Sequence, residues 1–152
     1  MPDRKHPDTI VIRPAVAADA SDICEVCKNG LGYECDAELV KYRLEQLKQD
    51  EEIVFVSDIG EKTVGFVHAQ TYRCLYYETA LNILGLAVLP DFRRNGIGSA
   101  LMKAVEDRAK KLGINVIRLN SGASRKGAHE FYRKIGYHNE KEQIRFLKYL
   151  QE

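Results

Sequence analysis

The chain has 152 residues, which is about the length of one domain. Hydrophobic residues make up 45% and charged residues 30%, so the chain has enough apolar material for a packed core and is not expected to be disordered. The formal net charge of +1 gives no overall attraction to nucleic acid or to an anionic membrane surface. We therefore expect a single domain over 1–152 with neither of these as a partner.

Hydrophobic runs and the first residues bear on localisation. The longest apolar run, 83–89, is far shorter than the roughly 20 residues of a membrane span. The opening MPDRKHPD is polar and lacks the apolar core of a signal peptide. These patterns predict a soluble protein of the cytoplasm.

The four cysteines are Cys24, Cys27, Cys35 and Cys74. A chain that builds its own core does not need a disulfide framework, so reduced thiols are expected. Cys24 and Cys27 form a C-x-x-C, which fits a redox pair or half of a zinc site. A zinc site needs two more ligands at comparable spacing, and the histidines are scattered. Packed thiols are therefore favoured, and no metal is expected.

The first half of the chain predicts two helices and three strands. The first strand, 9–13, is rich in β-branched residues and stops before Pro14. Apolar residues then recur at helical spacing, and Asp36 is placed to cap the second helix. Two further strands flank a turn that contains Gly60, which is typical of a hairpin. The expected helices are 18–28 and 37–48, and the hairpin strands are 53–57 and 63–69.

The second half begins with 83–89 (ILGLAVL), which Pro90 closes and which we expect to be a strand buried on both faces. The remaining expected elements are a helix over 97–112, a strand over 116–119, a short helix over 128–135 and a last strand over 145–150. A strand, helix and strand in succession form a crossover unit with parallel strands. The order predicts an α/β (α+β) fold: a mixed sheet of about six to seven strands with helices on both faces.

The segment 93–99 (RRNGIGS) joins a buried strand to the first turn of a helix. Unpaired backbone N–H groups and the positive end of the helix dipole meet there, so the position suits an anion. Gly96 and Gly98 leave room for a pyrophosphate, and Arg93 and Arg94 add charge. Neither a Walker A loop nor G-x-G-x-x-G is present. The glycines alone fit a tight turn equally well.

The context of this loop resembles one family. Residues 88–98 read V-L-P-D-F-R-R-N-G-I-G, which is similar to the signature V-x-P-x-x-R-x-x-G-x-G of the GNAT superfamily of acetyl-CoA-dependent N-acetyltransferases. A second block over 128–137, AHEFYRKIGY, also resembles that family. The resemblance implies a GNAT-like domain with a splayed pair of parallel strands. It also implies acetyl-CoA as co-substrate.

The resemblance further implies a cofactor site between strands 83–89 and 116–120. Backbone groups of the first strand would bind the pantetheine arm, and the amides of 94–99 the pyrophosphate. Arg125 stands where many relatives carry an asparagine, and an arginine can pair with phosphate. The implied cofactor-binding residues are Leu86, Ala87, Val88, Arg93, Arg94, Asn95, Gly96, Ile97, Gly98, Ser99, Asn120 and Arg125.

Tyr132 matches the family tyrosine that faces the sulfur of CoA, so the resemblance implies that it is the general acid. Asn82 stands where many relatives carry a glutamate base. An amide is no useful base, so either Asn82 positions a water or Glu78 takes the proton. His68 and Tyr72 are further candidates, and the sequence leaves the base open.

The resemblance places the acceptor pocket at the first two helices and their loop, where Tyr33 and Glu34 suit a cationic amine. Tyr72 and Glu78 are candidates for the opposite wall, together with Tyr76 and Tyr77. A small-molecule or peptide amine is the expected acceptor. The same residues also fit an amphipathic surface or a homodimer contact. A CoA-binding sensor with little turnover, or a nucleotide-binding protein, is the alternative to an enzyme.

Overall fold

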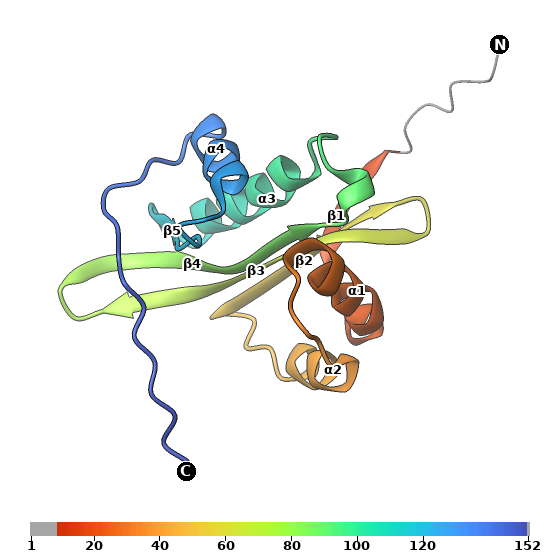
Figure 1. Ribbon diagram of the computed structural model, residues 1–152, viewed down its shortest axis with the longest axis horizontal. Helices are drawn as coiled ribbons and strands as arrows, with labels where there is room; N and C mark the ends of the chain where they lie inside the picture. Colours follow the sequence, from red (N-terminus) through yellow and green to blue (C-terminus); the bar gives the residue numbers. More distant parts are fainter. Residues whose placement is uncertain (1–8, 152) are drawn as a thin grey trace. The chain divides into compact units, whose positions relative to one another are not determined.

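A computed structural model describes residues 9–151, which form two compact units, 9–120 and 121–151 (Figure 1). The prediction that the chain has no signal peptide rests on residues 1–8, which lie outside the described residues. A single domain over 1–152 stays a prediction. Within the described residues, no helix is long and apolar enough to cross a membrane.

The first unit is built on one five-stranded sheet, with the strands in the order β1-β2-β3-β4-β5. The first three neighbouring pairs are antiparallel, and β4 and β5 are parallel, as the crossover pattern predicts. The strands are β1 Ile10–Pro14, β2 Glu52–Ile59, β3 Lys62–Cys74, β4 Tyr77–Val88 and β5 Ile117–Leu119.

Helices cover both faces of this sheet, as expected (Figure 1). On one face, a Cβ built on Gly30 of α1 would lie 3.2 Å from the Cβ of Ala87 on β4. On the other face, a Cβ built on Gly65 of β3 would lie 3.3 Å from a methyl group of Leu101 on α3. The unit's helices are α1 Ala20–Leu31, α2 Ala37–Glu45 and α3 Ile97–Lys111, with short 3-10 turns η1 Ala17–Asp19 and η2 Pro90–Phe92.

The core lies between the sheet and these helices. It is filled by aliphatic side chains that alternate along the strands and recur at helical spacing on α1 and α3. Full burial of each contributes about 1.5–3 kcal/mol of hydrophobic free energy. The larger apolar residues with no exposed area are Val26, Val56, Val64, Val67, Leu81, Leu101, Met102 and Val105.

The prediction of a last strand over 145–150 is wrong, and so is the prediction of six to seven strands. The segment has no strand structure, and Phe146 and Leu150 are 87% and 88% exposed. Apolar alternation in the sequence favours a strand, but a strand forms only where a neighbouring backbone completes its hydrogen bonds. Within the described residues, 145–150 pairs with no strand.

The strand expected over 83–89 begins earlier, at Tyr77, and carries a β-bulge. His68 of β3 lies opposite Gly85 and Ala69 lies opposite Ile83, so Leu84 is the extra residue on β4. β5 pairs with β4 only over Leu81–Ile83. Beyond the bulge, β4 is bonded to β3 alone among the described strands, so the parallel pairing ends at the bulge, as in the splayed pair that the resemblance implies.

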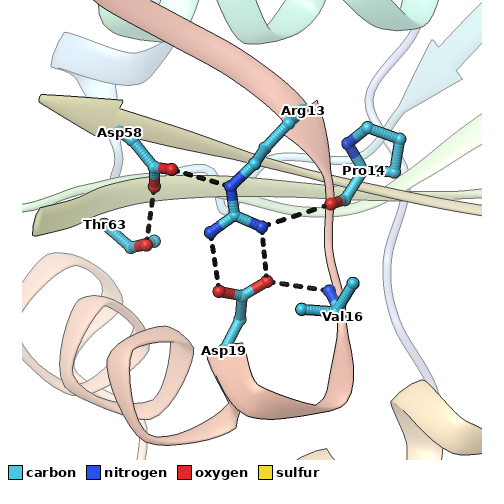
Figure 2. Close-up of polar contacts among 6 residues, drawn as sticks. All are labelled: Arg13, Pro14, Val16, Asp19, Asp58 and Thr63. Atoms are coloured by element: carbon cyan, nitrogen blue, oxygen red, sulfur yellow. Dashed lines mark hydrogen bonds and ion pairs between the residues drawn. The ribbon is translucent and has the colours of Figure 1, made fainter. Parts of the chain in front are cut away.

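A buried ion cluster joins the start of α1 to the sheet (Figure 2). Arg13 of β1 donates from its two terminal nitrogens to both carboxylate oxygens of Asp19, at 2.8 and 2.9 Å. Its Nε donates to Asp58 of β2 at 2.7 Å, and Thr63 of β3 donates to the other oxygen of Asp58. The cluster therefore ties η1, just before α1, to three strands.

Candidate active site

The segment between β4 and α3 bends tightly before the helix begins. Arg94 has φ of +66°, and Gly96, the N-cap of α3, has φ of +76°. A non-glycine residue at positive φ is uncommon in folded chains and marks a constrained turn. Backbone N–H groups in such turns converge on a concave surface that suits an anion.

The first turn of α3 has no side chain to satisfy its free N–H groups. Gly96 makes no side-chain cap, and the turn contains no acidic residue. The first four N–H groups of a helix lack intrahelical partners, and the helix dipole is positive there. A Cβ built on Gly96 would meet no heavy atom within 4 Å, so the space beside these groups is open. The position is therefore suited to a phosphate.

Two side chains brace this loop. Arg93 donates to the backbone oxygen of Gly30 at the end of α1, over 2.9 Å. The amide nitrogen of Asn95 donates to the backbone oxygen of Phe92 at 3.1 Å. Arg94 is exposed beside them. Arg93 and Asn95 thus hold the turn in shape, while Arg93 and Arg94 keep the loop positively charged.

The part of β4 beyond the bulge offers backbone groups to a ligand. Leu86, Ala87 and Val88 pair with β3 on one edge only. The N–H and C=O groups of successive residues in a strand point to opposite edges, so some of these groups point away from β3. An extended chain of amides is the kind of ligand that such an edge binds.

Asn82 of β4 is hydrogen-bonded to a side chain of the neighbouring strand β5. Its side-chain oxygen accepts a hydrogen bond of 2.7 Å from Nη1 of Arg118, the middle residue of β5. The guanidinium carbon of Arg118 lies 4.4 Å from the centre of the Tyr72 ring on β3. The structure therefore brings the candidates Asn82 and Tyr72 together, and it adds Arg118, which the sequence analysis missed. An arginine inside the short apolar strand VIRL was the available signal.

His68 lies at the bulge, opposite Gly85. Its Nε2 is buried and has no hydrogen-bond partner among the described residues. Burial lowers the pKa of its imidazole below the ordinary value, because the charged form loses its hydration. His68 is therefore neutral at pH 7 and has a free ring nitrogen.

Glu78 is exposed near the tip of the β3–β4 hairpin. It precedes Asn82 by four residues on one strand, a separation of about 13 Å at 3.3 Å per residue. Tyr33 and Glu34 are also exposed, in the loop between α1 and α2. The structure does not bring Glu78 to the bulge.

The thiols of Cys24, Cys27 and Cys35 are free and half-buried. The sulfur atoms of Cys24 and Cys35 lie 2.6 Å apart. Burial, helped by Cys24, raises the pKa of Cys35 to about 11, so the thiol form dominates at neutral pH. No group of three or more metal-binding side chains occurs within residues 9–151.

The second unit carries the helix α4, Lys126–Lys134, with Arg125 as its N-cap. The Tyr132 ring packs edge-on against Phe131 at 5.1 Å and Tyr137 at 6.1 Å between ring centres. Burial raises the pKa of the Tyr132 phenol above its ordinary value, so it keeps its proton at neutral pH. Asn120 is exposed directly after β5 and ends the first unit.

Residues 20–137 match the model of the acetyltransferase (GNAT) family. The chain belongs to the GNAT family. This confirms the resemblance drawn from the two sequence blocks, and the match covers the loop 93–99, Asn82 and Tyr132 together.

Individual GNAT relatives differ in how much of the chain they share. An uncharacterized N-acetyltransferase of Methanocaldococcus jannaschii is 38% identical over 101 residues, which is 65% of this chain and 44% of that protein. The chain thus spans less than half the length of this relative. The aminoalkylphosphonate N-acetyltransferase of Salmonella typhimurium is 32% identical over 138 residues, 84% of this chain and 80% of that protein.

Solved structures support the fold. The aminoglycoside 6'-N-acetyltransferase of Acinetobacter baumannii superposes with a TM-score of 0.79 at 19% identity. The superposition covers 94% of this chain and all of that one. At this identity the likeness establishes a GNAT-like architecture.

Proposed function

We propose that the chain is an acetyl-CoA-dependent N-acetyltransferase that acetylates a primary amine by direct attack in a ternary complex. The observation that carries the proposal is the uncapped first turn of α3, which follows the open edge of β4. Membership of the GNAT family supports the same activity. Acetyl-CoA would supply the thioester, and the chain's residues bind, orient and move protons.

In this proposal, β4 and the loop that follows it bind different parts of acetyl-CoA. Backbone groups of Leu86, Ala87 and Val88 would bind the pantetheine amides. The amides of 94–99 would hold the pyrophosphate, with charge from Arg93 and Arg94. Asn120 and Arg125 complete the proposed cofactor set.

Acetyl transfer needs a neutral amine, a general base and a general acid. The amine nitrogen forms the new bond to the acetyl carbon while the bond from that carbon to sulfur breaks. The proton lost by the nitrogen goes to the base, and the sulfur receives one from Tyr132. A phenol that burial keeps protonated suits this acid role.

His68 is the base that best fits these requirements. It is neutral, carries a free ring nitrogen and lies at the bulge, where the strands separate. The oxygen of Asn82 already accepts a hydrogen bond from Arg118, so Asn82 is better suited to positioning than to proton transfer. Glu78 lies about 13 Å from Asn82 along β4 and farther still from the bulge, which disfavours Glu78 as the base.

A small-molecule amine is the proposed acceptor, with Tyr33, Glu34, Tyr72 and Glu78 at its rim. The relatives named for an aminoalkylphosphonate and for aminoglycosides support this class. A peptide amine and a homodimer stay predictions of the sequence. A location in the cytoplasm also stays a prediction of the sequence.

Release of free CoA thiol from acetyl-CoA, measured over a panel of primary amines, tests the proposal. We expect amine-dependent release with at least one acceptor and an acetylated product of matching mass. Tight binding of acetyl-CoA with no release on any amine would favour a CoA-binding sensor instead. Preference for ATP or NAD over CoA in calorimetry would reject both.

A further inference from the structure

Arg118, Asn82 and Tyr72 form a cluster on one face of the sheet. Their strands are neighbours, with Asn82 opposite Arg118 and Ala80 opposite Tyr72. On β3, Tyr72 shares its face with Phe66, because side chains alternate along a strand. Phe66 pairs with Ala87, whose Cβ lies 3.2 Å from a Cβ built on Gly30 of α1. The cluster therefore lies on the face that α1 covers.

The charge of Arg118 is not balanced within the described part of the chain. Its partners among the described residues are the neutral amide oxygen of Asn82 at 2.7 Å and the aromatic ring of Tyr72 at 4.4 Å. No salt bridge within 4.0 Å joins it to a described carboxylate. Arg118 is half-buried, so water screens its charge only in part.

Arg13 in the same sheet shows the contrasting arrangement. That half-buried guanidinium donates three hydrogen bonds to two carboxylates, Asp19 and Asp58, which balance its charge (Figure 2). A structural arginine usually finds such partners, because an unpaired charge away from water is unfavourable. Arg118 is instead held in place by neutral groups that leave most of its five N–H donors available.

The position of the cluster relative to the bulge limits what it can bind. Asn82 precedes Leu84, the bulged residue, by two positions, or about 7 Å along β4. A ligand whose amine lies at the bulge and whose far end reaches Arg118 therefore has a short linker. A guanidinium fixed in plane by stacking favours two-point contact with a carboxylate or a phosphonate.

We propose that Arg118, positioned by Asn82 and Tyr72, binds an oxyanion on the acceptor, so that the substrate is a short primary amine carrying a carboxylate or phosphonate. The inference rests on the proposed function and narrows its substrate class. Polycationic amines are disfavoured, because a second positive charge would face Arg118.

Matched pairs of amines test the inference. β-Alanine is compared with its neutral amide, and 2-aminoethylphosphonate with its neutral diethyl ester. We expect the anionic member of at least one pair to have a KM roughly 10- to 100-fold lower, the range for a charged hydrogen bond. The pair with the larger ratio identifies the oxyanion. Equal KM values within both pairs would overturn the inference while leaving the acetyltransferase proposal intact.

Variants assign the effect to Arg118. In Arg118→Gln we expect the KM of the anionic amine to rise roughly 10- to 100-fold, which is the same factor that separates the two members of the matched pair. The KM of acetyl-CoA and the KM of the neutral amine should change little. Arg118→Lys should recover only part of the loss, because it keeps the charge without the planar fork. Arg73→Gln, which removes an exposed positive charge from the same sheet, is the matched control. A rise in the KM of acetyl-CoA alone would contradict the inference.

Calorimetry on the CoA-bound protein separates the two proposals if no amine reacts. Binding of the anionic amine that is lost in Arg118→Gln supports the oxyanion site, even when thiol release is absent and the transferase proposal fails. Absence of binding by both anionic amines overturns the oxyanion site.

Discussion

Asp19 illustrates how one buried carboxylate fixes a local structure. It accepts two hydrogen bonds from Arg13 and one from the backbone N–H of Val16, and its side chain is only 8% exposed. These bonds hold the pKa of the Asp19 carboxyl below its ordinary value. The start of α1 therefore depends on an ionised Asp19.

The lowered pKa makes stability depend on pH in acid. The contribution is complete above the pKa of about 3.9 in the unfolded chain and is lost as the pH falls through the lower folded value. Urea unfolding should show a free energy of unfolding that declines below pH 4. Asp19→Asn should lower it by about 2 kcal/mol at pH 7 and flatten the decline. Asp50→Asn, an exposed control, should do neither.

Tyr132 gives a prediction about turnover. Tyr132→Phe keeps the ring that packs on Phe131 and Tyr137 but removes the proton. We expect kcat to fall roughly 100-fold or more, with acetyl-CoA affinity within a few-fold, because general acids contribute about that much. Steady-state kinetics and calorimetry measure the two quantities. Unchanged kcat would remove Tyr132 from the mechanism.

His68 gives a prediction about pH. Because burial lowers its pKa, the neutral, basic form persists to below the ordinary value of about 6.5. The acid limb of the kcat profile should therefore lie below pH 6.5. His68→Gln should lower kcat and abolish that limb, while an unaltered limb would assign it to another group. Profiles in overlapping buffers provide the measurement.

At the level of single elements, α3 and the turn before it form the proposed phosphate site. The helix starts at a glycine with φ of +76°, and the residue two before it, Arg94, is also at positive φ. Sequence pattern identifies the loop, but the brace from Arg93 to Gly30 joins segments 63 residues apart. Only the folded chain shows that the end of α1 and the loop 93–99 contact each other through this hydrogen bond.

Gly96→Asp tests the role of this turn. A carboxylate there should abolish acetyl-CoA binding in calorimetry, through repulsion of the pyrophosphate and strain at positive φ. Gly113→Asp is matched, since Gly113 also has positive φ and open space around a Cβ but follows the end of α3. Gly113→Asp should lower the free energy of unfolding and leave the affinity for acetyl-CoA unchanged. Normal binding by Gly96→Asp would show that the loop is misplaced.

At the scale of the whole molecule, the sequence predicts most of the framework. Strong periodicity gives α1, α2, α3 and the parallel connection of β4 to β5. Local patterns cannot show which backbone a segment meets, so 145–150 was assigned as a strand and the early start of β4 at Tyr77 was missed. For the same reason, local patterns do not predict contacts between strands that are far apart in the sequence, such as the hydrogen bond from Arg118 to Asn82.

Ligand binding should stabilise the fold as a whole. A ligand that binds only the folded state adds RT ln(1 + [L]/Kd), or about 2.7 kcal/mol at 100 times Kd. We expect the Tm to rise with acetyl-CoA concentration and to respond far less to acetate or ATP. Scanning fluorimetry at several concentrations measures this shift. A Tm that does not change with acetyl-CoA would argue against the cofactor site.

β5 is three residues long, and its outer two side chains share the face of the buried Leu81 and Ile83. Only the middle residue reaches the α1 side of the sheet. If Arg118 binds the acceptor as proposed, a substitution at this one position would change the charge of the acceptor site and leave the two side chains on the opposite face, Ile117 and Leu119, in place.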